Sequence, residues 1–139
     1  MPKIKIEGNR KLSGTITVSG AKNSVVALIP AAILCDESTV ISNVPNITDV
    51  DDLDNILVHL NAEFKTTEGT IEIDSSKILN KEITYELSKK LRASYYFMGA
   101  LLGKFKKVDM YFPGGCSIGA RPINLHLKGF ELIGAKITE

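Results

Sequence analysis

Residues 19–34 read SGAKNSVVALIPAAIL, in which a Ser-Gly turn precedes an almost wholly apolar segment. We interpret residues 21–34 as a buried helix that follows this turn. The longest apolar run of the chain, residues 25–35, is interrupted by Pro30 and falls short of the ~20 residues that a membrane span requires. The sequence therefore predicts a soluble protein with no membrane contact.

Strand-like residues lie on both sides of this helix. Residues 1–6 alternate charged and apolar side chains, residues 15–18 continue that character, and residues 40–44 are mostly β-branched. We expect a strand at each of these places, with Pro45 ending the third. No hydrophobic segment follows residues 1–6, so they do not resemble a signal peptide.

A second helix and a hairpin are predicted farther along the chain. The apolar residues that recur at helical spacing, and so should share one face, are Val50, Leu53, Leu57 and Leu60. We expect Thr48 or Asp49 to cap this helix and Asn61 to end it in the left-handed conformation. Residues 64–73 are predicted to form a hairpin that turns at residues 68–69, because Gly69 tolerates the positive φ of such turns.

The second half of the chain repeats this order. The expected elements are a strand-like region at Ile83, a helix over 92–102, a strand over 108–112 and a helix over 122–133. Matching positions in the two halves lie at similar spacings. Lys22 and Arg92 are 70 residues apart, Pro45 and Pro113 are 68 apart, and the helix ends at Asn61 and Gly134 are 73 apart. Such regularity favours one duplicated βαβαβ unit, so the predicted fold class is α/β with about two units present.

Two such units do not obviously make a closed fold, because each helix must bury its apolar face against a neighbour. Residues 135–138 also resemble the beginning of a strand that has no later partner. We therefore expect a fragment, or a subunit that needs a partner. The alternative is a complete small α/β domain with an irregular end.

The composition is that of an ordinary globular domain. The chain has 139 residues, of which 44% are hydrophobic and 24% charged, enough for one core. Its formal net charge is +1, so no global field favours nucleic acid or an anionic membrane. The two cysteines, Cys35 and Cys116, suit neither a disulfide framework nor a zinc site, so we expect a reducing, cytoplasmic location.

Two basic residues occupy matching positions at the predicted starts of apolar helices. Lys22 and Arg92 would each lie where unpaired N–H groups and the helix dipole already disfavour a cation. Their presence suggests an anion bound between them. The alternative is that both side chains extend into solvent and each helix begins slightly later.

A second candidate site is the loop PGGCSIGARP at residues 113–122. Its three glycines allow backbone N–H groups to approach an anion closely. Those N–H groups and Arg121 should lower the pKa of the Cys116 thiol, which would make it a usable acid or nucleophile. Pro122 fits the first position of the following helix. By contrast, Cys35 lies in the apolar helix and is expected to be a structural residue.

Other motifs are absent or weak. The glycines near Lys22 lack the spacing of a phosphate-binding P-loop, and the loop at 113–122 contains no Lys-Ser or Lys-Thr, which argues against a nucleoside triphosphatase. We place His126 on a helix surface or behind the site, because the further partners of a cysteine protease are not visible. His59 is assigned no role.

The residues that carry a family resemblance are SGAKN at 19–23, RAS at 92–94, the loop at 113–122, LHL at 125–127 and GFE at 129–131. Together they closely resemble the UDP-N-acetylglucosamine 1-carboxyvinyltransferase family, over essentially the whole chain. Members of that family are about three times longer, with two domains that each contain three copies of the unit. The resemblance implies that this chain shares the inside-out α/β barrel fold of the enolpyruvyl transferases. It also implies that residues 1–20 are a strand segment of the second domain and that 21–139 are an incomplete substrate-binding domain.

The resemblance also implies an activity and its residues. The family transfers the enolpyruvyl group of phosphoenolpyruvate to UDP-N-acetylglucosamine, at the first committed step of peptidoglycan synthesis, without metal or organic cofactor. Cys116 matches the cysteine that protonates phosphoenolpyruvate and that fosfomycin alkylates. Lys22, Asn23 and Arg121 match the phosphoenolpyruvate site. The residues that match the UDP-N-acetylglucosamine site are Arg92, Arg121, Pro122, Ile123, Asn124 and Leu125.

Two departures from the family matter. Aspartate is common at the position of Asn124, so contact with the uracil end should be weaker or rearranged here. The general base and further arginines of the family lie in sequence that this chain lacks, so the chain alone should be inactive. The rival hypothesis is a truncated, non-catalytic paralogue that binds a nucleotide sugar or a partner protein. The shikimate-pathway enolpyruvyl transferase is a weaker alternative, because its members lack the cysteine loop.

Overall fold

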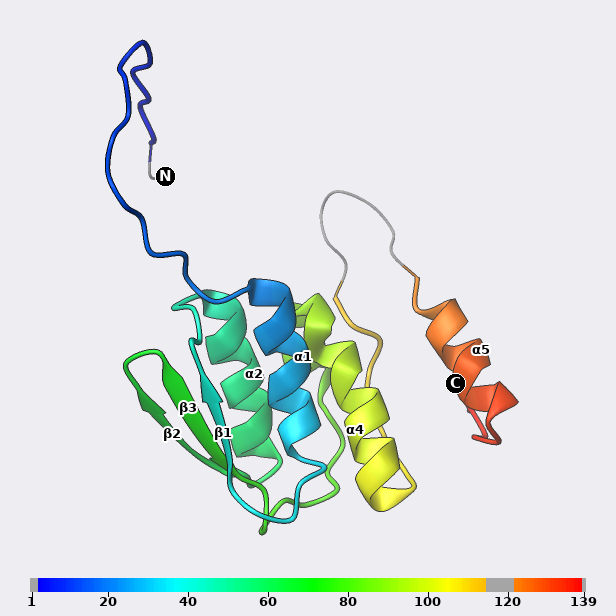
Figure 1. Cartoon of the computed structure of the whole chain (residues 1–139). Helices are drawn as coiled ribbons and strands as arrows, with labels where there is room; N and C mark the ends of the chain where they lie inside the picture. The colour runs from blue at the N-terminus through cyan, green and yellow to red at the C-terminus, as the bar shows by residue number, and fades with distance from the viewer. Residues whose placement is uncertain (1–2, 115–121, 139) are drawn as a thin grey trace.

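A computed structural model describes residues 3–114 and 122–138 of the chain. Figure 1 shows helices grouped on one side of a small sheet, with an extended N-terminal segment. In chain order the elements are α1 (Lys22–Ala32), β1 (Thr39–Ser42), α2 (Thr48–His59), β2 (Glu63–Thr67), β3 (Thr70–Asp74), α3 (Tyr85–Lys90), the 3-10 helix η1 (Arg92–Tyr95), α4 (Tyr96–Phe105) and α5 (Asn124–Leu132). This mixed α/β arrangement agrees with the predicted fold class.

The sheet has the strand order β1-β3-β2, and both pairings are antiparallel. Ile41 pairs with Ile71, and Ile73 pairs with both Thr39 and Phe64. Gly69 turns the β2–β3 hairpin with a φ of 68°, as predicted. Ile71 and Ile73 point from the central strand into the core because alternate residues of a strand face the same side.

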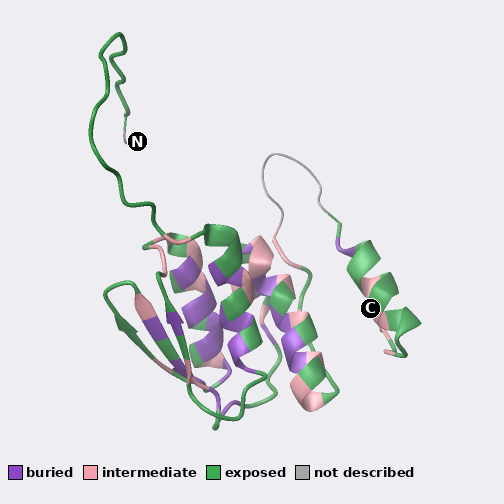
Figure 2. Cartoon of the chain, viewed as in Figure 1, coloured by how far each residue is buried: buried purple, intermediate pink, exposed green. Residues whose placement is uncertain are grey.

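The core lies between the sheet and the helices α1, α2 and α4, which pack against one another around α1. Figure 2 shows the buried residues along the sides where these elements meet. The predicted face of α2 is confirmed, since its four residues are all buried. The largest side chains that are fully buried include Ile29 and Ile33 near α1, Leu53 and Leu57 of α2, and Phe97 and Leu101 of α4.

The helix ends differ in part from the prediction. Thr48 is the first residue of α2 and Ile47 its N-cap, with no side-chain cap hydrogen bond, so capping by Thr48 or Asp49 is wrong. The last helix begins at Asn124 and not at Pro122. Asn61 has a φ of 67° and Gly134 a φ of 99°, so the left-handed end expected for the second helix is confirmed. Matching residues end α2 and α5, which supports the duplication.

The second half forms fewer strands than predicted. Ile83 and the segment 108–112 make one isolated parallel bridge, between Ile83 and Met110, in place of two strands. A strand needs a ladder of partners, and among the described residues this bridge is the only pairing the two segments share. The predicted helix over 92–102 is divided into η1 and α4, and α3 was not predicted.

The expected strands over residues 1–6 and 15–18 are also corrected. Residues 3–20 contain no strand. Ile4, Ile6, Leu12, Ile16 and Val18 keep 82–91% of their surface exposed. The alternating pattern is present, but none of the described strands lies beside it to complete the hydrogen bonds (Figure 1). Within the described parts of the chain, no helix is long and apolar enough to cross a membrane.

Candidate functional site

Three helices begin at one end of the molecule. In Figure 1, α1, α2 and the η1–α4 pair all start at the end where the N-terminal segment joins α1. Their unpaired N–H groups and dipoles therefore lie at the same end, which favours anions there. This is where the structure places the two predicted basic residues, Lys22 as the first residue of α1 and Arg92 as the first residue of η1.

Lys22 makes an ion pair with the neighbouring helix. Its Nζ lies 2.5 Å from Oδ1 of Asp49, in the first turn of α2. The Lys22 side chain remains 56% exposed, whereas that of Asp49 is only 20% exposed. Lys22 is therefore held by a partly buried carboxylate and still accessible from solvent. Asn23, the next residue of α1, is exposed.

Arg92 lies in a small aromatic cluster. Its guanidinium carbon is 5.9 Å from the centroid of the Tyr95 ring, a cation–π arrangement, because residues three apart overlie one another in a 3-10 helix. Tyr95 stacks on Tyr96 with 4.4 Å between ring centroids. Tyr95 also contacts the His126 ring of α5, with 5.0 Å between the ring centroids. This cluster connects η1 to the start of α5. His126 is exposed on α5, as predicted for a residue of the helix surface.

The residues around the start of α5 have different environments. Ile123 is the N-cap of α5 and is 4% exposed, so it belongs to the core. Pro122, Asn124 and Leu125 are exposed, Leu125 by 75%. Their side chains are therefore accessible from solvent. The catalytic candidate Cys116 and Arg121 lie outside the described residues.

The last described residue before that gap, Gly114, is fixed by the fold. Its N–H donates to the Ser88 carbonyl oxygen at 2.9 Å. A Cβ built on Gly114 would lie 1.9 Å from the Lys89 carbonyl oxygen, so only glycine allows this approach. The first glycine of the predicted loop is thereby packed against the end of α3, immediately before Arg92.

One buried carboxylate was not found by the sequence analysis. Asp54 of α2 is 9% exposed, and its Oδ1 has no hydrogen-bond partner. Burial, and secondarily the charge of Asp51, raises its pKa from 3.8 to about 6. Asp54 lines a cavity of about 670 Å³ between α2 and the β2–β3 hairpin. Its place beside Leu53 in an amphipathic helix offered no signal that it would be buried.

The position of Cys35 differs from the prediction that it is a structural residue of the apolar helix. It lies beyond the end of α1 and is exposed, so it is not a buried structural residue of that helix. Its carbonyl oxygen accepts hydrogen bonds from Ser75 Oγ at 2.7 Å and Lys104 Nζ at 3.3 Å. The helix ends at Ala32, two residues earlier than predicted, and this places Cys35 in the connection to β1.

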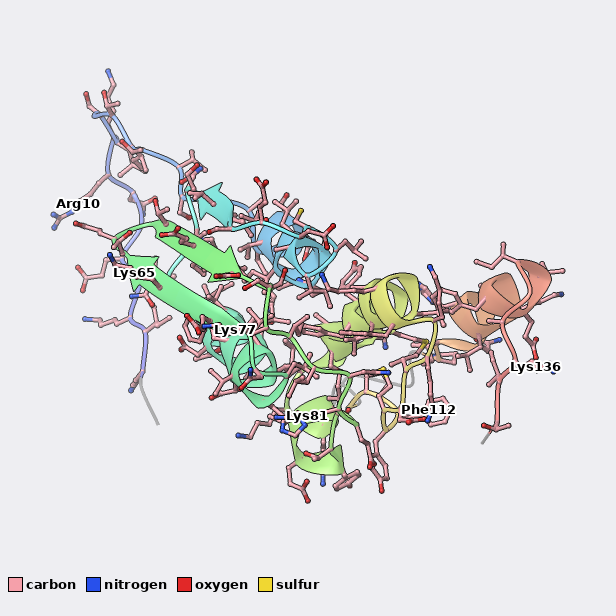
Figure 3. All side chains as sticks on the ribbon, turned by 90° about the horizontal axis from the view of Figure 1, so that it is seen from below. Arg10, Lys65, Lys77, Lys81, Phe112 and Lys136 are labelled. Carbon is pink, nitrogen blue, oxygen red and sulfur yellow. The ribbon has the colours of Figure 1, made fainter. Side chains whose placement is uncertain are left out.

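A second cavity lies between α4 and α5. Its volume is about 930 Å³, and Phe112 and Lys136, both labelled in Figure 3, are among the residues that line it. Figure 3 shows α5 beside α4, on the side away from the sheet. In the described part of the chain, no group of three or more His, Cys, Asp or Glu residues could hold a metal ion.

Comparisons with known proteins place these features in a wider context. A family model described as EPSP synthase (3-phosphoshikimate 1-carboxyvinyltransferase) matches residues 6–139. The chain is 50% identical over 136 residues to a UDP-N-acetylglucosamine 1-carboxyvinyltransferase 2 of Listeria monocytogenes, covering 98% of this chain and 32% of the relative. It is 49% identical over 138 residues to a UDP-N-acetylglucosamine 1-carboxyvinyltransferase 1 of Streptococcus agalactiae, covering 99% and 33%.

A solved structure is also similar. The crystal structure of the enolpyruvyl transferase NikO from Streptomyces tendae matches with a TM-score of 0.61 and 28% identity, covering 68% of this chain and 22% of that one. The chain spans about a third of the length of the curated relatives it matches.

Proposed function

Because this chain belongs to the EPSP synthase family of carboxyvinyl transferases, we propose that it is part of an enzyme that transfers the enolpyruvyl group of phosphoenolpyruvate to UDP-N-acetylglucosamine. One observation carries this choice of substrate: relatives named for UDP-N-acetylglucosamine are about 50% identical over nearly the whole chain. The cysteine loop at 113–122 supports it against the shikimate-pathway reaction. The proposed enzyme works in the cytoplasm, in peptidoglycan synthesis, without a cofactor.

The proposed reaction is an addition followed by an elimination. The sugar 3-hydroxyl oxygen forms a bond to C2 of phosphoenolpyruvate, and Cys116 gives its thiol proton to C3. A base accepts the proton that the hydroxyl oxygen loses as this bond forms. In the second step C3 loses a proton, the C2–O bond to phosphate breaks, and the electron pair of that bond leaves with the phosphate.

The basic residues stabilise the charges of these steps. Lys22 and Arg121, with Asn23 beside them, hold the phosphate and carboxylate of phosphoenolpyruvate. The accessible position of Lys22 at a helix start supports this role. Arg92 and residues 121–125 form the wall for the nucleotide sugar, and the exposure of Asn124 and Leu125 is compatible with it.

We also propose that residues 1–20 belong to a second domain, and that 21–139 are part of the substrate-binding domain. Support comes from the alternating apolar side chains of residues 4–18, which are exposed without a partner in the described chain. Such a surface is usually covered by another part of a protein. The rest of the enzyme is therefore the expected partner of this chain.

The test is to join this chain to the C-terminal two-thirds of the Listeria relative and to measure phosphate release from the two substrates. The joined enzyme should turn over and lose activity on treatment with fosfomycin, whereas Cys116→Ser should form no fosfomycin adduct, since a hydroxyl is a weaker nucleophile than a thiol. The 139-residue chain alone should show no turnover. A folded joined protein that binds UDP-N-acetylglucosamine but never releases phosphate would favour the alternative, a non-catalytic paralogue.

A further inference from the structure

The pair of Lys22 and Asp49 crosses between the first turns of two packed helices. The Lys22 Nζ to Asp49 Oδ1 distance is 2.5 Å, and α1 packs beside α2 along this interface. The Asp49 side chain is mostly buried, while the Lys22 side chain is more than half exposed. The carboxylate is therefore the fixed member of the pair, and the ammonium group lies between it and solvent.

The helix dipoles explain why the acidic member of the pair lies on α2 and pairs with a lysine on α1. The first turn of α1 contains no acidic residue, and its first residue is a lysine, which the helix dipole disfavours. The first turn of α2 contains Asp49 and Asp51, which the dipole of α2 favours. Neither helix has a side-chain cap at its N-terminus. Because the first turn of α1 has no acidic residue, the carboxylate that pairs with Lys22 comes from Asp49 at the start of α2.

We propose that Asp49 is a positioning residue, which holds the Lys22 ammonium group in the orientation that receives the anionic groups of phosphoenolpyruvate. This inference rests on the proposed function for its substrate. An ammonium group on a four-carbon side chain has many rotamers, and fixing it costs free energy when the ligand binds. Asp49 removes part of that cost beforehand, because one ammonium hydrogen is already directed to the carboxylate. Two N–H donors of Lys22 stay available for the substrate.

The chain offers a matched control. Asp51 lies in the same first turn of α2 and carries the same charge, but it is not the carboxylate that pairs with Lys22. Asp49→Asn and Asp51→Asn each remove one acidic residue from the start of α2. Only Asp49→Asn removes the ion pair, and Asp49→Glu keeps the charge on a side chain longer by one methylene.

The first experiment uses the 139-residue chain and does not depend on catalysis. Each variant is treated briefly with sulfo-N-hydroxysuccinimide acetate, and Lys22 acetylation is followed by mass mapping. In Asp49→Asn, Lys22 should be acetylated about 2- to 5-fold faster than in wild type or Asp51→Asn, as expected for loss of a partly exposed ion pair. Equal Lys22 rates in all three proteins would show that the pair is absent in solution and would overturn the proposal.

The second experiment uses this chain joined to the C-terminal part of the Listeria relative. Asp49→Asn should raise the KM for phosphoenolpyruvate about 2- to 5-fold while the KM for UDP-N-acetylglucosamine stays unchanged, and Asp49→Glu should recover part of the loss. Asp51→Asn should behave as wild type. Equal effects of Asp49→Asn and Asp51→Asn, or tighter phosphoenolpyruvate binding in Asp49→Asn, would overturn the positioning role. A folded wild-type joined protein without turnover would contradict the proposed function instead, and the acetylation result would still stand.

Discussion

Gly20 packs directly against the carbonyl oxygen of Asn43. A Cβ built on Gly20 would lie 1.7 Å from Asn43 O and 2.9 Å from its carbonyl carbon. Gly20 lies two residues before the start of α1, and Asn43 follows β1 with a φ of 56°. The contact recurs in the second half, where Gly114 packs against Lys89, which precedes η1. Both halves thus bring two backbone segments together at the helix starts, with a glycine on one side of each contact.

The first prediction is that Gly20→Ala destabilises the chain by roughly 2–4 kcal/mol, because backbone must move to admit the methyl group. Gly114→Ala should act similarly, since its Cβ would lie 1.9 Å from the Lys89 carbonyl oxygen. Urea unfolding followed by circular dichroism measures both. The control is Gly129→Ala, in α5 with nothing within 4 Å of the new Cβ, which should be neutral or add about 0.5–1 kcal/mol. Equal effects at Gly20 and Gly129 would contradict the close contact.

The second prediction concerns the buried carboxyl of Asp54, whose pKa rises to about 6. Since the folded pKa is above the unfolded value, Asp54 favours the folded state at low pH. That contribution is lost as the pH rises from about 4 through about 6. Asp54→Asn should therefore be more stable than wild type by roughly 1–3 kcal/mol at pH 7.5 and equal to it below pH about 4.

Urea unfolding of Asp54→Asn and wild type at several pH values measures this difference. The control is Asp51→Asn, which removes the secondary cause of the shift and should lower the pKa of Asp54 only in part. A stability difference that does not change between pH 4 and pH 7.5 would mean that Asp54 does not titrate as described.

The third prediction concerns Tyr95 and the attachment of α5. Apart from its buried N-cap Ile123, α5 has no buried residue, so the contact of Tyr95 with His126 should help to hold its first turn. Tyr95→Ala should increase hydrogen exchange of the amides at 126–132 by about 3- to 10-fold, as expected for loss of about 1 kcal/mol of aromatic contact. Tyr95→Phe keeps the ring and should exchange like wild type. Unchanged exchange in Tyr95→Ala would show that other contacts hold α5.

The fourth prediction concerns the two cysteines. Because Cys35 is exposed, iodoacetamide should modify it in the native chain, contrary to the buried residue that the sequence suggested. Cys35→Ser should preserve the fold and isolate the reaction of Cys116. If backbone N–H groups and Arg121 activate Cys116, it should react faster than Cys35 near pH 7, and Arg121→Ala should slow it only in part. Mass mapping after brief labelling measures both rates, and a Cys116 no faster than Cys35 would argue against activation.

The sequence alone determined the elements that depend on local patterns. The spacing of Leu53 and Leu57 predicted the buried face of α2, because a helix repeats every 3.6 residues whatever lies beside it. Gly69 and Asn61 marked a hairpin turn and a helix end, because few residues adopt a positive φ easily. The loop at 113–122 and the residues around Lys22 and Arg92 pointed to the family, since short motifs are visible without a fold.

Only the tertiary structure decided what depends on neighbours distant in sequence. Residues 15–18 and 108–112 have strand-like composition, but a strand forms where a partner supplies hydrogen bonds, and the described chain supplies only one bridge at Met110. The partner of Lys22 could not be predicted either, because Asp49 is 27 residues away and meets it only when α1 packs on α2. Burial of Asp54 likewise follows from the hairpin that closes over α2, since desolvation is a property of the packed surroundings and not of the residue.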